Sequence, residues 1–139
     1  MRFTFTKILT SIALFGGCFV PVLMDLGSTH LLNDLWDAHA RTHLVWMISS
    51  FFLIFILGMY FLWIKDEEYT PAFMSLCVLI GYAISAMTIS LYGGVFLGEG
   101  GVEPKPFGIP VNLIHFSCML LIQLISLILL YRKQKIDTN

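Results

Sequence analysis

The sequence predicts an all-α membrane protein in which four transmembrane helices form an up-down-up-down bundle. Hydrophobic residues make up 58% of the 139 residues and charged residues only 12%, whereas a soluble domain carries roughly 25% charged residues. The charged residues also leave four charge-free stretches, each close to the roughly 20 residues that a helix needs to cross a bilayer. At this length we expect a single integral membrane domain, residues 1–139.

The first expected span covers residues 8–24 and follows Lys7. The basic N-terminus, the apolar run and the segment Gly16-Gly17-Cys18 also resemble a secretory or lipoprotein signal that is processed at Cys18. The apolar run, however, continues past Cys18 to Met24, where a cleaved signal normally becomes polar. We therefore expect the segment to be retained as a transmembrane helix.

The second, third and fourth spans are expected at residues 44–64, 72–92 and 111–131. Only the short charged link at 65–70 separates the second span from the third, so these two should form an antiparallel helical hairpin. The third loop, residues 98–110, is rich in glycine and proline. That composition is typical of a connection built from turns, or of a flap over a site.

Small residues predict where the helices approach one another closely. Gly16 and Gly17 provide such a place in the first span. In the third span, Gly81 and Ser85 have the small-x-x-x-small spacing found at close contacts between membrane helices.

The distribution of Lys and Arg predicts that both chain termini are cytoplasmic, because short cytoplasmic loops are enriched in these residues. Six of the eight lie in the N-terminus, the second loop and the C-terminus, and two lie in the other loops. They are Arg2, Lys7, Lys65, Arg132, Lys133 and Lys135 on one side and Arg41 and Lys105 on the other. We expect a multi-pass protein of the plasma or inner membrane, with the first and third loops outside the cytoplasm.

Histidines and other polar residues concentrate at the extracytoplasmic ends of the expected spans. The histidines are His30, His39, His43 and His115. The other polar residues of this layer are Asp25, Asn33, Asp37, Arg41, Tyr92 and Asn112. Polar residues at the mouth of a membrane bundle are costly and usually have a role. The layer is therefore the candidate functional site.

The segment before the second span is expected to begin a helix at Asn33, a good N-cap residue. Helical periodicity places one set of side chains on a common face: Trp36, His39, His43 and Trp46. Asp37 and Arg41 fall on the other face, four residues apart, where an ion pair is expected.

A second polar stripe runs along the fourth span and is expected to face the interior of the bundle. It consists of Asn112, His115, Met119, Gln123 and Ser126. If the second and fourth helices pack face to face, His39, His43 and His115 converge, with His43 nearest to His115.

The residues from Asn33 to His43 read N-x-x-W-x-x-H-A-R-x-H. This pattern resembles the signature of a family of small, uncharacterised four-span membrane proteins, in which a Thr/Ser-His pair shortly before the Asn is also common; here that pair is Thr29-His30. Family members usually carry prolines after the Asn and before the His, where this chain has Asp34, Asp37 and Ala38. The resemblance implies a four-span layout. It implies no reaction, because the family has no assigned activity.

Three functions remain open for the polar layer. The first is acid–base chemistry on, or binding of, a lipid-soluble small molecule, because histidine titrates near neutral pH and a nearby carboxylate can tune it. In this interpretation the catalytic residues are His39, His43, His115 and Asp37. The residues that bind the substrate are Trp36, Trp46, Tyr92, Asn112 and Arg41.

The second function is a metal site with His39, His43 and His115 as ligands, or a haem held between His43 and His115. The third is that of a non-catalytic accessory subunit in an oligomer or a larger membrane complex. The net charge of −1 gives no electrostatic reason to expect nucleic acid as a partner. The lipid bilayer is the partner that the composition predicts.

Overall fold

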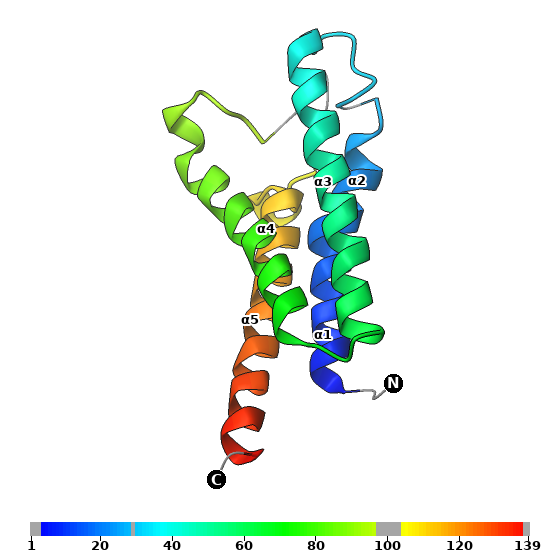
Figure 1. Ribbon diagram of the computed structural model, residues 1–139. Helices are drawn as coiled ribbons and strands as arrows, with labels where there is room; N and C mark the ends of the chain where they lie inside the picture. Colours follow the sequence, from blue (N-terminus) through cyan, green and yellow to red (C-terminus); the bar gives the residue numbers. More distant parts are fainter. Residues whose placement is uncertain (1–3, 29, 97–103, 138–139) are drawn as a thin grey trace.

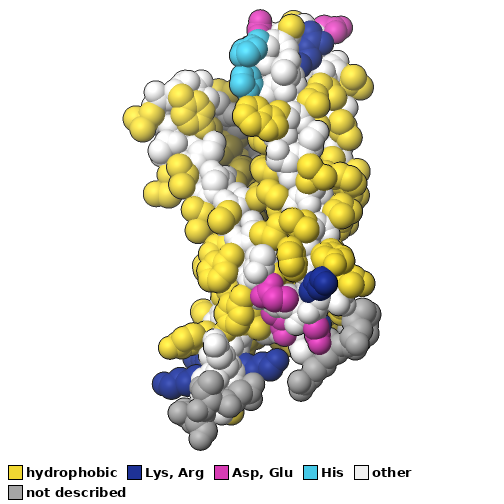
Figure 2. Space-filling view, in the orientation of Figure 1, with side chains coloured by type: hydrophobic (Ala, Val, Ile, Leu, Met, Phe, Trp, Pro, Cys, Tyr) yellow, Lys and Arg dark blue, Asp and Glu magenta, His cyan; other side chains and the backbone are white. Residues whose placement is uncertain are grey.

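The computed structural model describes residues 4–28, 30–96 and 104–137 and is all-helical over these residues (Figure 1). Within them, four helices are long and apolar enough to cross a membrane: Phe5–Asp25, Ala38–Trp63, Tyr69–Leu91 and Val111–Ile136. Large apolar side chains cover much of the visible outer surface (Figure 2), as with Leu53, 66% exposed, and Leu121, 60% exposed. The chain is therefore an integral, multi-pass membrane protein with the predicted four-helix architecture.

The first span is a continuous helix of three parts: α1 (Phe5–Leu14), the π-helical turn η1 (Phe15–Phe19) and α2 (Val20–Asp25). The other elements are α3 (Ala38–Trp63), α4 (Tyr69–Thr88) with the 3-10 turn η2 (Ile89–Leu91), the 3-10 turn η3 (Pro106–Gly108) and α5 (Val111–Asp137). Part of the loop expected to act as a connection or flap, residues 98–103, lies outside the described residues.

The helices extend past the charge-free stretches from which they were predicted. α1 includes Lys7, and α4 begins at Tyr69 rather than at residue 72. Pro71 is tolerated there, because N–H groups in the first turn of a helix have no hydrogen-bond acceptor within the helix, so the N–H that proline lacks is not needed. The carboxylate of Glu67 accepts hydrogen bonds from the N–H groups of Tyr69 (2.7 Å) and Thr70 (3.0 Å), which caps the helix.

The predicted start of the second helix at Asn33 is wrong, since α3 begins at Ala38 with Asp37 as its N-cap. The Asp37 carboxylate accepts hydrogen bonds from the N–H groups of His39 (2.8 Å) and Ala40 (3.4 Å). The Asn33 side chain instead accepts one from the N–H of Leu35 at 3.0 Å, which stabilises a turn. Both residues are good caps, and the local sequence does not distinguish between them.

The first helix lies between the others and is the most buried of the four. It packs against α5 and α3, and α4 packs against α3 and α5. Over the described residues, α3 and α5 share no extended contact and occupy opposite corners of the bundle. The expected face-to-face packing of the second and fourth spans is therefore wrong. Short connections make sequence neighbours into spatial neighbours, which leaves these two spans on a diagonal.

The two ends of the bundle differ. At one end α1 begins, α3 connects to α4 and α5 terminates (Figure 1); we call this the hairpin end. At the other end, here called the histidine end, α4 diverges from α3 (Figure 1). Figure 2 shows a hollow between the two helices there.

Close helix packing occurs at the first-span glycines, as predicted. A Cβ atom added to Gly16 would lie 2.2 Å from the sulfur of Met119, and one added to Gly17 would lie 2.9 Å from Leu79. Cys18 is fully buried beside them. The expectation for Gly81 is wrong, because nothing lies within 4 Å of a Cβ added there. The spacing of Gly81 and Ser85 correctly indicates a surface of small side chains on α4, but that surface faces away from the other helices.

The two glycines provide a matched test of this packing. Gly16→Ala is expected to lower the free energy of unfolding by about 1–3 kcal/mol, because the methyl group displaces Met119. Gly81→Ala adds the same methyl group in open space and should raise the free energy of unfolding by up to about 1 kcal/mol, the helix propensity difference. Reversible unfolding in mixed micelles, followed by circular dichroism, measures both. A loss of equal size in the two variants would contradict the assigned packing.

Candidate functional site

His39 and His43 form a pair on the exposed surface of α3. Their Nε2 atoms are 3.0 Å apart, and their ring centroids are 4.5 Å apart with nearly perpendicular planes. The ring of Trp46 follows one turn later, 6.2 Å from that of His43. Figure 2 shows histidine side chains at the histidine end of α3, on the side toward α4.

His115 lies elsewhere and supports the first helix. The N–H of Val20 bonds to the carbonyl of Phe15 in the π-helical register. In that register the carbonyl of Gly16 would need the N–H of residue 21, and Pro21 has none. The Nε2 of His115 lies 2.8 Å from the Gly16 oxygen. Because a carbonyl only accepts, His115 carries its proton on Nε2 and donates it.

The predicted convergence of His39, His43 and His115 is therefore wrong. His115 faces the first helix, while the histidine pair lies on α3, at the opposite corner of the bundle from α5. Among residues 4–28, 30–96 and 104–137, no three His, Cys, Asp or Glu side chains are grouped so that they could hold a metal ion. A haem bridge between His43 and His115 does not fit this arrangement of helices.

The expected ion pair between Asp37 and Arg41 is also absent from the ion pairs of the described residues. Asp37 is the N-cap of α3, and its carboxylate points to the backbone N–H groups of the first turn. The Nε of Arg41 is buried without a hydrogen-bond partner. The Asp37 carboxylate cannot both cap the helix and pair with Arg41 one turn farther along, so the two interactions compete.

The remaining residues of the predicted layer form separate local contacts. Trp36 packs edge-on against His30, with ring centroids 5.3 Å apart. His30 in turn lies 3.6 Å from the carboxylate of Asp25. The hydroxyl of Tyr92 bonds within its own segment, 2.8 Å from the Ser85 hydroxyl, and Asn112 is exposed in the first turn of α5. The histidine end thus holds several small polar contacts rather than one layer.

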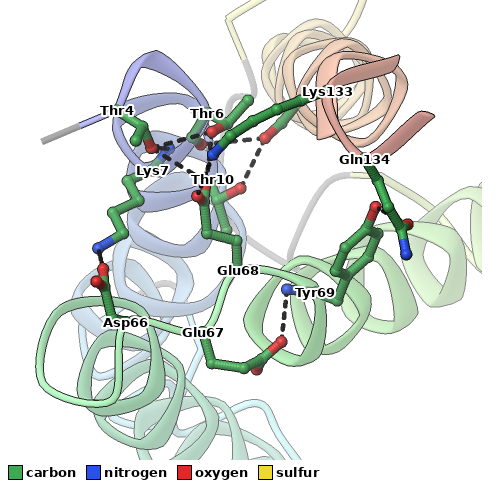
Figure 3. Close-up of polar contacts among 11 residues, drawn as sticks. Thr4, Thr6, Lys7, Thr10, Asp66, Glu67, Glu68, Tyr69, Lys133 and Gln134 are labelled. Atoms are coloured by element: carbon green, nitrogen blue, oxygen red, sulfur yellow. Dashed lines mark hydrogen bonds and ion pairs between the residues drawn. The ribbon is translucent and has the colours of Figure 1, made fainter. Parts of the chain in front are cut away.

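A second polar cluster, which sequence reasoning missed, occupies the hairpin end (Figure 3). Lys7 is only 1% exposed and forms an ion pair with Asp66 in the α3–α4 link. Its ammonium group also lies 5.4 Å from the ring centroid of Trp63. This ion pair and cation–π contact hold α1 against the end of α3.

Glu68 connects three helices in the same cluster. Its carboxylate accepts hydrogen bonds from the hydroxyls of Thr4 (3.1 Å) and Thr6, both at the start of the first helix. The ammonium group of Lys133, on α5, lies 3.8 Å from its other oxygen. Figure 3 shows these groups pointing toward one another from α1, α4 and α5.

The polar contacts continue from this cluster into the bundle. The hydroxyls of Thr10 and Ser126 are 2.8 Å apart and buried, and Ser126 donates to the Thr6 carbonyl at 3.1 Å. One turn farther along α5, Gln123 is fully buried and neither of its amide atoms has a hydrogen-bond partner. Ser75 of α4 is likewise fully buried with an unpartnered hydroxyl.

Helix register places Gln123 and Ser75 at about the same depth. Met119 lies against Gly16 and Leu79 against Gly17, and Gln123 and Ser75 each follow one turn closer to the hairpin end. The predicted inward stripe of the fourth span is thus confirmed at His115, Met119, Gln123 and Ser126, while Asn112 is exposed. The sequence signal that could have revealed the cluster is the spacing of Thr6 and Thr10 around Lys7 in the first helix.

A groove of about 410 Å³ lies between α4 and α5 toward the histidine end. Tyr82 and Phe116 stack on each other in its wall, with ring centroids 3.9 Å apart and planes 12° from parallel. The lining comprises Leu79, Tyr82, Ala83, Ala86, Met87, Phe96, Leu113, Phe116, Ser117 and Leu120. It is almost entirely apolar.

No family model, curated protein or solved structure matches this chain. The resemblance of the segment from Asn33 to His43 to an uncharacterised family stays an expectation.

Gln123 provides a test of the buried polar stripe. Gln123→Met removes two unpartnered polar atoms at similar length, so it is expected to raise the free energy of unfolding by about 1–3 kcal/mol. Ser126→Ala removes hydrogen bonds that are made and should lower it by about 1 kcal/mol. Chemical unfolding in micelles compares the two variants. A loss of stability in Gln123→Met would mean that the amide has a partner such as a buried water.

Proposed function

We propose that this protein binds a lipid-soluble small molecule in the groove between α4 and α5. The groove is the observation that supports the proposal, because its volume of about 410 Å³ falls in the range of small-molecule sites, roughly 300–1,000 Å³. Its place between two membrane-spanning helices makes the bilayer the route by which a ligand arrives.

The chemistry of the walls supports an apolar ligand with a flat ring system. Among the described lining residues, only Tyr82 and Ser117 carry hydroxyl groups. The stacked rings of Tyr82 and Phe116 form a rigid aromatic wall against which another ring can pack. The small side chains of Ala83 and Ala86 leave room in the groove.

Binding fits the geometry better than acid–base catalysis by the predicted residues. His39, His43 and Asp37 are not among the residues that line the groove, and Nε2 of His115 is bonded to Gly16. The proposal therefore keeps the lipid-soluble ligand of the first interpretation and leaves out its reaction. A binding protein of this kind is also compatible with a role as a subunit of a larger membrane complex.

Fluorescence of the apolar ring compound aminoanthracene tests the groove. We expect saturable binding to the native protein in detergent, and Ala83→Phe should weaken it by at least about tenfold, because the added ring fills the groove. Cys77→Phe is the matched control, since Cys77 is an exposed residue of α4 outside the groove. Equal affinity in the two variants would contradict the proposal.

We also propose that the hairpin end faces the cytoplasm. The Lys and Arg asymmetry of the sequence supports this orientation. Single cysteines placed at Asp34 and Thr70, in a chain without the native cysteines, test it with a membrane-impermeant thiol reagent. Intact cells should label Asp34→Cys, and Thr70→Cys should react only after lysis; the reverse pattern would overturn the orientation.

A further inference from the structure

The four-residue spacing of His39 and His43 brings two ring nitrogens together on one face of α3. Their Nε2 atoms are 3.0 Å apart, and both side chains are exposed. A solute can therefore reach both nitrogens without any movement of the helix. The pair does not line the groove between α4 and α5, so what it binds is independent of the ligand proposed there.

We propose that His39 and His43 together bind a divalent transition-metal ion. Metal–imidazole bonds of about 2.0–2.1 Å place two ligand nitrogens about 3.3 Å apart in a tetrahedral site and about 2.9 Å apart at a right angle. The observed separation of 3.0 Å lies between these values. Each ring must turn away from the direction of the hydrogen bond between them so that both lone pairs face one ion.

The proton balance of this step is simple. Without the metal, one Nε2 carries a proton and donates it to the other. Binding through both Nε2 atoms moves that proton to Nδ1 of the same ring, a change of tautomer that a neutral imidazole makes readily. The ion then lies where the shared proton was. Because that proton stays on its own ring, the neutral pair releases no proton when the ion binds.

The donor atoms define the class of ion. Imidazole nitrogens favour Cu²⁺, Zn²⁺ and Ni²⁺, whereas Mg²⁺ and Ca²⁺ prefer oxygen ligands. No third His, Cys, Asp or Glu joins the pair within the described parts of the chain. The other coordination positions are then open to water or to an external ligand, as in metal sites that act on bound molecules.

Copper provides the sharpest test, because Cu²⁺ binds such sites more tightly than the other first-row divalent ions. The Trp46 ring centroid is 6.2 Å from that of His43, close enough for bound Cu²⁺ to quench its fluorescence. We expect saturable quenching in the full chain, purified without a polyhistidine tag. Electron paramagnetic resonance should show two coordinating ring nitrogens.

Substitutions distinguish Cu²⁺ binding at the His39–His43 pair from binding at other histidines. His39→Ala and His43→Ala should each weaken Cu²⁺ binding by at least about tenfold, because a chelate becomes a single contact. The double variant Ala40→His, His43→Ala keeps the number of histidines but places the two rings at neighbouring positions, about 100° apart around the helix. It should bind as weakly as His43→Ala, while His30→Ala should bind like the native protein.

Two results would overturn the proposal. One is equal Cu²⁺ affinity in the native protein and in the displaced-histidine variant. The other is quenching that persists in Trp46→Phe and disappears in His30→Ala, which would place the ion at His30 and Asp25. Because His39 and His43 are exposed, every variant should keep its helical content, and circular dichroism checks this directly.

Discussion

The carbonyl of Gly16 must find a hydrogen-bond donor in a region from which water is excluded, and much of the packing depends on how it does so. Pro21 cannot supply an N–H to the π-helical turn, so the imidazole of His115 supplies one from α5. An unsatisfied carbonyl in a lipid environment would cost several kcal/mol. The hydrogen bond fixes the depth at which α5 lies against the first helix, and it brings Met119 onto the bare surface of Gly16. A histidine that looks catalytic in the sequence is thus a structural residue.

The polar cluster at the hairpin end and the groove toward the histidine end are two consequences of one arrangement. At the hairpin end, Lys7 with Asp66 ties the first helix to the α3–α4 link, and Glu68 with Lys133 ties the start of α4 to α5. Within the described residues, no comparable ion pair joins α3 to the far part of α4, which diverges there (Figure 1). The groove between α4 and α5 lies toward this same, less tied end of the bundle.

The four spans could be predicted from the sequence because charge and hydropathy report directly on transfer into lipid. The inward stripe from His115 to Ser126 could be predicted as well, since only the bundle interior offers it partners. The sequence could not predict which helix supplies those partners, because periodicity identifies the buried face of a helix but not the helix that packs against it. Asn33 and Asp37 are equally good caps, and Gly17 and Gly81 equally small; tertiary contacts alone decided between the members of each pair. The predicted convergence of His39, His43 and His115 failed for the same reason, because the first two lie on α3 and the third lies on α5, at opposite corners of the bundle.

The contacts between the first helix and α5 also join segments that are synthesised far apart in time. Gly16 and His115 are 99 residues apart in sequence, and Thr10 and Ser126 are 116 apart. While the ribosome is still producing α5, the first helix is already in the bilayer, and Thr10 and the Gly16 carbonyl lack the partners that α5 supplies. The first helix can pack against α3 and α4 before α5 is present. Its native contacts are completed only once α5 has entered the bilayer.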